Sequence, residues 1–331
     1  MKHNGNDTDL RVHVLKTLLY YDIFNYPLKC KEVFNFLGTN SITEADVQHT
    51  LELLVKDAVV FRFNDLYSIQ PHESNVHRRL TGNMEAEKYL GIAREKAKLI
   101  SKFPFVRAVL ASGSLSKGYM DERSDIDYFI ITAPKRLWIA RTLLVMYKRL
   151  FLKGSHKHFC VNYFIDEDHL EIEEKNLFTA TELATVLPLY GAEQYTKLIK
   201  TNNWLKGFFP NYAARHIENV PGLTIKGYKK IFETLINVCF ATRIESYFRK
   251  LTMNRWKRLY EKEYSKADFD IAFKSKAYAS KNHPQHFQRT IMERYTEKVN
   301  LFDFSFVSNN KRNLSLDGGI GSIGQEQVRN V

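Results

Sequence analysis

The segment that most constrains the fold of this chain is Val106–Thr132, in which two short apolar runs flank a turn of small residues. The first run, Val106–Ala111, is too short for a buried helix and predicts a strand that ends in a Ser-Gly-Ser turn. The second run, Ile126–Ile131, predicts another strand, which is entered through Asp125. The segment therefore predicts a strand, a tight turn, a short helix and a second strand.

Two carboxylates, Asp125 and Asp127, follow this turn at the entry to the second strand. Residues two apart in a strand point to the same face, so the two side chains are expected about 6–7 Å apart. Like charges this close raise each other's pKa unless a cation lies between them. Mg²⁺ commonly uses one or two carboxylates together with substrate phosphates, and Mn²⁺ prefers the same oxygen ligands. The pattern predicts a Mg²⁺ or Mn²⁺ site here, beside a turn whose backbone can approach a phosphate.

Gly113-Ser114, ten further residues and then Asp125-Ile126-Asp127-Tyr128 resemble the signature of the polymerase-beta-like nucleotidyltransferase superfamily. The resemblance covers roughly residues 85–210, and the motif itself is confined to 110–131. It implies an α+β fold with a small mixed sheet flanked by helices. In the family, the Gly-Ser pair holds a nucleoside triphosphate and the paired aspartates bind Mg²⁺, which implies these roles for Gly113 and Ser114, and for Asp125 and Asp127.

The family's site is completed by a third carboxylate from a neighbouring strand, and here the chain departs from the pattern. The next predicted strand, His158–Ile165, carries Asn162 at the position that should face the two aspartates. An amide oxygen can bind Mg²⁺, but it carries no charge and is a poor base. Four other acids remain alternatives, two just past the strand and two in a further predicted strand: Asp166, Asp168, Glu171 and Glu173.

The resemblance implies an enzyme that transfers a nucleoside monophosphate from a nucleoside triphosphate to an acceptor and releases pyrophosphate. The acceptor can be a small molecule, a protein side chain or an RNA end. Lys117, one turn after the Gly-Ser pair, is expected to neutralise a phosphate, with an exposed helix lysine as the alternative. The rival hypothesis keeps the fold but makes the chain a catalytically weak or inactive nucleotide- or nucleic-acid-binding regulatory protein.

Residues 1–75 predict three helices followed by a hairpin, which is the outline of a winged-helix-like domain. The third helix is expected to begin at a capping box of Ser41 and Glu44 and to end at Lys56. Two apolar runs around Asn64-Asp65 predict the hairpin. The third helix is acidic at its start and poor in bases, so packing or protein contact is favoured over DNA reading, and any nucleic-acid contact should be weak.

The remaining divisions follow from composition. Residues 76–210 are expected to form the nucleotidyltransferase domain with a leading linker helix, 211–307 a basic helical region with one long helix at Lys229–Lys262, and 308–331 a disordered tail. Thr179 and Glu182 match a second capping box, which favours Glu182 as a helix-start residue over a catalytic acid.

The charge and the cysteines indicate partners and compartment. The net charge of +12 favours an anionic partner. The three cysteines are widely separated, without metal spacing or a disulfide framework, which indicates a reducing cytoplasm. The most apolar stretch, Leu137–Leu152, contains three bases and is too short to span a bilayer. It is expected to be the crossover helix between the aspartate strand and the His158 strand, and no transmembrane segment is predicted.

Overall fold

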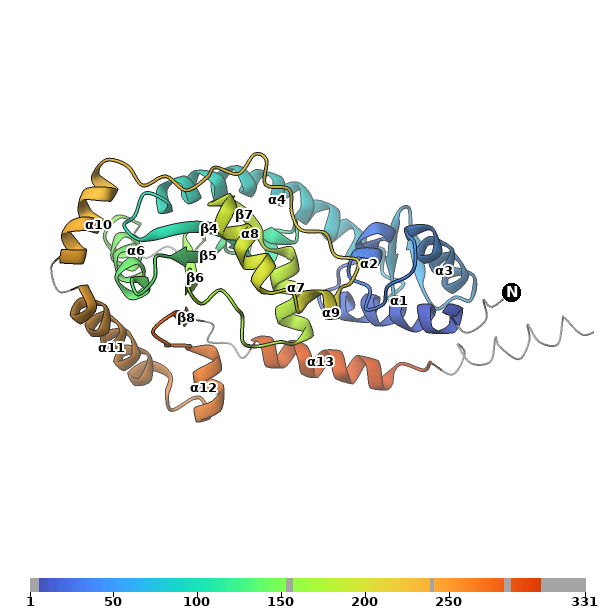
Figure 1. Cartoon of the computed structure of the whole chain (residues 1–331). Coiled ribbons are helices and arrows are strands. Elements are labelled where there is room, and N and C mark those ends of the chain that lie inside the picture. The colour runs from blue at the N-terminus through green and yellow to red at the C-terminus, as the bar shows by residue number, and fades with distance from the viewer. Residues whose placement is uncertain (1–5, 153–156, 239–240, 283–286, 305–331) are drawn as a thin grey trace, which may run out of the picture. The chain divides into compact units, whose positions relative to one another are not determined.

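The computed structural model describes residues 6–152, 157–238, 241–282 and 287–304. Helices and strands are mixed along the chain, and the strands form two open sheets, which confirms the predicted α+β class. The chain divides into two compact units, Met1–Pro71 with Arg294–Val331 and His72–Glu293, whose elements are labelled in Figure 1. The segment predicted to be a disordered tail, 308–331, lies outside the described residues.

The first unit combines helices with a small antiparallel sheet. Its elements before the boundary are α1 (Asn6–Asp22), β1 (Leu28–Lys29), α2 (Cys30–Asn35), α3 (Glu44–Lys56), β2 (Phe61–Phe63) and β3 (Leu66–Ser68). Strand β3 lies between β1 and β2. The predicted hairpin is confirmed, and it turns at Asn64, whose φ of 55° is the left-handed value that Asn tolerates.

Helix α3 is capped by a different residue from the one predicted. The Thr43 hydroxyl accepts a hydrogen bond from the backbone N–H of Asp46 at 3.2 Å, and the Asp46 carboxylate accepts one from the Thr43 N–H at 2.7 Å. The predicted capping box of Ser41 and Glu44 is therefore wrong. Ser41 has a φ of 63°, whereas a residue at this position of a helix normally has extended backbone.

The last described helix, α13 (Phe287–Leu301), contributes its C-terminal part to the first unit. The ring of Tyr295 lies edge-on to that of Tyr20, with centroids 5.6 Å apart. The Nζ of Lys298 lies 2.6 Å from the carboxylate of Asp22, which is buried. Tyr295 and Lys298 lie in the region predicted to be basic and helical, and their packing against Tyr20 and Asp22 was not predicted.

The second unit is built on a five-stranded sheet of order β7-β4-β5-β6-β8. Its strands are β4 (Val106–Ser112), β5 (Asp127–Thr132), β6 (Cys160–Asp166), β7 (Leu187–Tyr190) and β8 (Ala279–Lys281). β5 and β6 are parallel and the other neighbours are antiparallel, so the sheet is mixed. The parallel pair is joined by α6 (Leu137–Phe151), the crossover helix that the sequence predicts. Among the described helices, none is both long and apolar enough to cross a membrane.

Helices cover both faces of this sheet (Figure 1). Besides α6 they are α4 (Glu73–Ile100), α5 (Gly113–Ser116), α7 (Leu177–Thr185), α8 (Ala192–Thr201), α9 (Leu205–Phe208), α10 (Tyr228–Val238), α11 (Ala241–Tyr260) and α12 (Lys266–Ala272). One core cluster joins Val109 and Ile130 to α4 and α6, and another joins Leu110 and Ile131 to α7 and α8. Because both faces are covered, β4 and β5 are apolar at successive positions.

Four features of this unit differ from the prediction. Strand β7 was not predicted, and it contains Pro188, which is tolerated because β7 is an edge strand. Strand β8 lies inside the region predicted to be helical throughout. The single helix predicted at Lys229–Lys262 is described as α10 and α11, with 239–240 between them outside the described residues. The segment Leu170–Glu174, in which Glu171 and Glu173 were predicted to lie in a strand, is neither helix nor strand.

Candidate functional site

The turn after β4 brings the aspartate strand against a glycine. Ser112, the last residue of β4, pairs with Asp127, the first residue of β5. Gly113 follows with a φ of 65°, and a Cβ atom built on it would lie 2.5 Å from Oδ2 of Asp127. Any other residue at 113 would therefore meet both backbone strain and a clash with the carboxylate. Ser114 lies beside Gly113 in α5 and is half-buried.

Asp127 is the centre of the site. Its Oδ1 accepts a hydrogen bond from Nδ2 of Asn162 at 2.9 Å, so the residue predicted for the third position does lie beside the carboxylate. Asn162 occupies the point where the pairing of β5 with β6 shifts by one residue. The pKa of Asp127 is raised to about 6, chiefly by burial and also by the charges of Glu182 and Asp125, while a hydrogen bond from Cys160 lowers it.

Asp125 lies outside the strand in which the sequence placed it. β5 begins at Asp127, so the alternation of a strand does not set the position of Asp125. The preceding backbone pairs instead with the loop before β6, because the N–H of Ile126 donates to the carbonyl of Lys157 at 2.9 Å. Asp125 is nevertheless close enough for its charge to raise the pKa of Asp127.

Lys117 and Glu182 form an ion pair next to this carboxylate. The Nζ of Lys117 donates to Oε1 of Glu182 at 2.6 Å and to the carbonyl of Gly113 at 3.1 Å. The Lys117 side chain is 22% exposed, so it is not the exposed helix lysine of the alternative interpretation. Both groups act on Asp127, whose pKa the charge of Glu182 raises and that of Lys117 lowers.

Glu182 lies inside α7 and not at the start of the helix, where it was predicted. Helix α7 begins after Asn176, whose side chain accepts a hydrogen bond from the N–H of Thr179 at 2.9 Å. The predicted capping box of Thr179 and Glu182 is therefore wrong, because both residues lie inside the helix. One signal was available in the sequence, since Glu182 is the single charged residue of α7.

Two further groups border the site without having been predicted. Cys160 pairs with Asp127 across the two strands, and burial together with the Asp127 charge raises the pKa of its thiol, which keeps the thiol protonated as a hydrogen-bond donor. The ammonium of Lys148 on α6 is buried, which lowers its pKa, while Cys160 and Asp125 raise it. The local groups are thus three carboxylates, an amide, a thiol and two amines.

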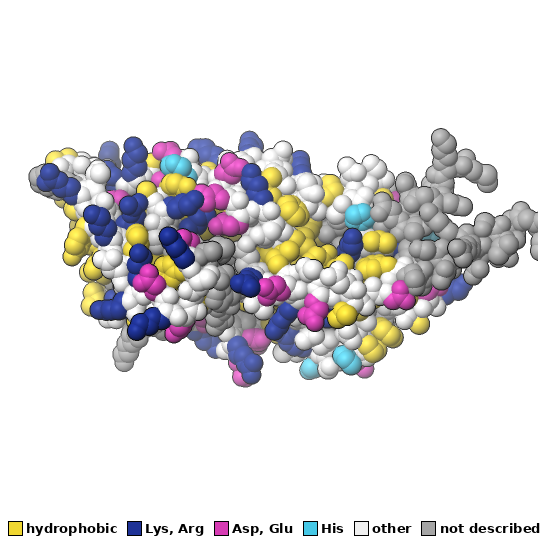
Figure 2. Space-filling view, turned by 90° about the horizontal axis from the view of Figure 1, so that it is seen from below, with side chains coloured by type: hydrophobic (Ala, Val, Ile, Leu, Met, Phe, Trp, Pro, Cys, Tyr) yellow, Lys and Arg dark blue, Asp and Glu magenta, His cyan; other side chains and the backbone are white. Residues whose placement is uncertain are grey.

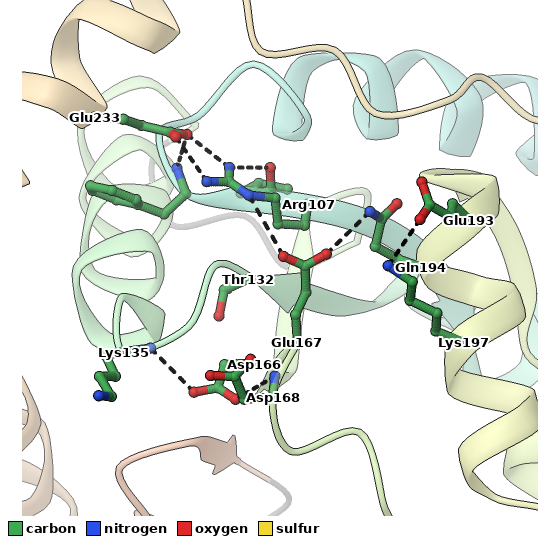
Figure 3. A network of polar contacts seen from close by, with 12 residues as sticks. Arg107, Thr132, Lys135, Asp166, Glu167, Asp168, Glu193, Gln194, Lys197 and Glu233 are labelled. Carbon is green, nitrogen blue, oxygen red and sulfur yellow. Dashed lines mark hydrogen bonds and ion pairs between the residues drawn. The ribbon is translucent and has the colours of Figure 1, made fainter.

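The other predicted acids belong to different surroundings. Asp166 pairs with Thr132 at the opposite end of β5 from Asp127, where it accepts hydrogen bonds from the Lys135 N–H at 3.3 Å and the Asp168 N–H at 3.2 Å (Figure 3). Glu173 accepts hydrogen bonds from Lys276 and from the Tyr278 hydroxyl, and the bond from Lys276 is the main cause that lowers its pKa to about 2.

The carboxylates and the amide of the Asp127 site could bind a metal ion through oxygen atoms. Within the described ranges, no group of three or more His, Cys, Asp or Glu side chains is arranged to hold a metal ion by itself. Asp127 is a mostly buried carboxylate, and the negative charges of Asp125 and Glu182 both raise its pKa. A divalent cation between carboxylates would relieve this repulsion, and a phosphate group could complete its oxygen ligands.

Comparison of the chain with models of protein families, with curated proteins and with solved structures gives no match.

Proposed function

We propose that the unit His72–Glu293 is a metal-dependent nucleotidyltransferase, which moves a nucleoside monophosphate from a triphosphate to an acceptor and releases pyrophosphate. The observation that carries the proposal is the contact of Asp127 with Gly113 on one side and with Asn162 on the other. It brings together the two halves of the Gly-Ser and Asp-x-Asp signature and the residue at the third position, although they come from three different elements. The mixed sheet with a crossover helix supports the same assignment.

The residues present fit a magnesium ion bound together with a triphosphate. Asp127 and Asp125 would supply the carboxylate oxygens, and Asn162, whose Nδ2 donates to Asp127, lies beside them. Two carboxylates with substrate phosphates are a common protein contribution to a Mg²⁺ site. When bound, the ion supplies charge neutralisation at the reacting phosphate.

The side chains around Asp127 would then have separate tasks. Gly113 lets the phosphates approach the backbone of the turn, and the Ser114 hydroxyl would donate to a phosphate oxygen. Lys117, already directed at Gly113 O, would turn its ammonium from Glu182 to a phosphate oxygen. Glu182, released from that pair, would be the carboxylate nearest to an attacking hydroxyl or amine and would accept its proton.

The alternative function is that of a nucleotide-binding regulatory protein that turns over slowly or not at all. Asn162 is the observation that favours it, because the amide takes the place of the family's third carboxylate and offers one neutral oxygen. Loss of a general base commonly costs about 10²–10⁴ in rate. Under this alternative triphosphate binding is retained and transfer is lost.

For residues 1–71 we propose a winged-helix-like module that contacts protein rather than reads DNA. The order α1-β1-α2-α3-β2-β3 and the sheet order β1-β3-β2 support the resemblance. Helix α3 begins with the acids Glu44 and Asp46, which repel phosphate, and this leaves at most a weak nucleic-acid contact. The proposed compartment is the cytoplasm.

The proposed function is tested by a panel of nucleoside triphosphates with and without Mg²⁺, scored by the rise in melting temperature. We expect at least one triphosphate to stabilise the protein only when Mg²⁺ is present, because the ion screens the repulsion between phosphates and carboxylates. Pyrophosphate release with candidate acceptors then separates the enzyme from the binding protein. If a triphosphate raised the melting temperature equally with and without Mg²⁺, both the enzyme and the binding-protein form of the proposal would be contradicted.

We predict that Asn162→Asp tightens the Mg²⁺-dependent binding of triphosphate by about tenfold, which corresponds to about 1.4 kcal/mol. The substitution adds a negative charge beside the Asp127 carboxylate, where a cation would gain most from it. Calorimetric titration with a non-hydrolysable triphosphate measures the change. The matched control is Asn176→Asp, the same chemical change at the α7 cap, where Asp serves equally well. Unchanged affinity in Asn162→Asp would show that residue 162 does not face the metal.

A further inference from the structure

Helix α10 packs its polar side against the sheet. Lys229 donates to the carbonyls of Ser101 at 2.8 Å and Val106 at 2.7 Å. Glu233, one turn later, accepts a hydrogen bond from the Phe105 N–H at 2.6 Å and two from the Arg107 guanidinium. Both side chains are buried, so the inward face of this helix is anchored by charge rather than by an apolar stripe.

The apolar side of α10 consequently points to solvent. Five large apolar side chains at helical spacing are between 52% and 80% exposed: Tyr228, Ile231, Phe232, Leu235 and Val238. Single exposed apolar residues are ordinary on a protein surface, but a contiguous stripe along one helix is typical of an interaction surface. An amphipathic helix normally buries such a stripe in the core, and α10 does the reverse.

Helix α11 continues this surface. Its Ile244 and Phe248 pack on the same small core cluster as Ile236 of α10, so the inward faces of both helices rest on one support. On α11 itself, Tyr247 and Leu251 border these packed residues and are 62% and 52% exposed.

The exposed charges of the two helices have one sign. Within Tyr228–Val238 and Ala241–Tyr260 the two acids are Glu233, which is buried, and Glu245, which accepts hydrogen bonds from the N–H groups of Trp138 and Ile139. The exposed charged residues are all bases: Lys230, Arg243, Lys250, Arg255, Lys257 and Arg258. Figure 2 shows this region at its left, where dark blue and yellow side chains are interspersed.

We propose that the outward faces of α10 and α11 bind the surface of an anionic lipid bilayer. An interfacial helix combines a large apolar face with Lys and Arg and lies in the headgroup plane, where apolar burial and attraction to anionic lipids add. The aliphatic members of the stripe, Ile231, Leu235 and Val238, argue against a nucleic acid, which is bound by basic residues and stacked aromatic rings. The uniform positive charge argues against a second copy of the chain, because two such faces repel each other. Residues 305–331 carry three bases and two acids, so their charge does not complement this surface either.

Sedimentation of the full chain with vesicles tests the proposal. We expect binding to phosphatidylcholine vesicles that contain phosphatidylglycerol, and little binding to phosphatidylcholine alone. The double substitution Phe232→Ser with Leu235→Ser should weaken binding at least about tenfold, because each side chain loses the burial of a large apolar group. Lys250→Glu with Arg258→Glu should weaken it by a similar factor, and high salt should do the same.

The matched control is Leu80→Ser with Met84→Ser on α4, which removes two equally exposed apolar side chains and should leave binding unchanged. If the α10 variant melts earlier than the wild type, Tyr247→Ser with Leu251→Ser on α11 makes the same test. Three results would overturn the proposal. In the first, the wild-type protein binds neither kind of vesicle. In the second, the serine variants bind vesicles as strongly as the wild type does. In the third, light scattering shows that the wild type is a dimer and that the α10 variant is not. Tight RNA binding that the serine variants retain would assign the bases to a nucleic acid instead.

Discussion

Replacing Asp127 with Asn abolishes the Mg²⁺-dependent binding of triphosphate and lowers any pyrophosphate release by about 10³-fold, or about 4 kcal/mol in activation free energy. The substitution keeps the size of the side chain and leaves an oxygen for the hydrogen bond from Asn162. It removes the charge, which is the property that a divalent cation needs. The loss is read from melting temperatures with and without triphosphate and Mg²⁺, and from pyrophosphate release.

The fold should survive this change. Burial raises the pKa of Asp127 to about 6, above its ordinary value, so the charged form costs folding free energy. This cost is absent at a pH below the unfolded pKa and fully present above about 6, and a neutral amide removes it. At neutral pH the variant should therefore melt at the same temperature as the wild type or higher.

The control for binding is Asp168→Asn. Asp168 is exposed, so this substitution should leave triphosphate binding intact. Equal responses of wild type and Asp127→Asn to triphosphate would remove Asp127 from the site.

The second large effect concerns the stability of the sheet at the end opposite Asp127. We expect Arg107→Met to lower the free energy of unfolding by about 3–5 kcal/mol, because it leaves Glu233 charged and buried without its main partner. The guanidinium donates to both carboxylate oxygens of Glu233, at 2.9 and 2.8 Å, and its Nε lies 3.8 Å from Oε2 of Glu167 (Figure 3). Burial would raise the pKa of Glu233, but the hydrogen bonds from Arg107 and from the Phe105 N–H outweigh it and lower the pKa.

Two controls make this measurement specific. Chemical denaturation of Arg107→Met combined with Glu233→Met should show most of the lost stability restored, since the second substitution removes the uncompensated charge. Lys88→Met breaks an ion pair whose side chains are 69% and 38% exposed, and it should change stability by less than about 1 kcal/mol. If Arg107→Met costs no more than Lys88→Met, the buried pair does not hold α10 to the sheet.

The parts of the fold that could be predicted are those in which local pattern and tertiary structure agree. The apolar runs at β4 and β5, the crossover helix α6 and the hairpin at Asn64 each have their own periodicity or turn residue, and the structure has them within a few residues of the prediction. The approach of Asn162 to Asp127 agrees with what the family resemblance implied, and it arises in a pair of parallel strands joined by a crossover helix.

The parts that could not be predicted depend on contacts distant in sequence. Strand β8 has three residues and exists because its backbone pairs with β6. Glu182 matched a local capping pattern, and only the position of α7 brings it to Lys117. The orientation of α10 depends on Arg107, which lies in another element and neutralises the acid that the helix turns inward. In each case a contact distant in sequence, rather than the local pattern, determines the structure.

The most direct test of the central claim is a calorimetric titration of the wild-type chain with a non-hydrolysable nucleoside triphosphate, in the presence of Mg²⁺ and in its absence. A site formed by Asp125, Asp127 and the Gly113-Ser114 turn predicts saturable binding with one triphosphate per chain when Mg²⁺ is present, and binding at least about tenfold weaker without it. Binding of equal strength in both titrations, or no binding of any triphosphate with Mg²⁺, would contradict the assignment of this site.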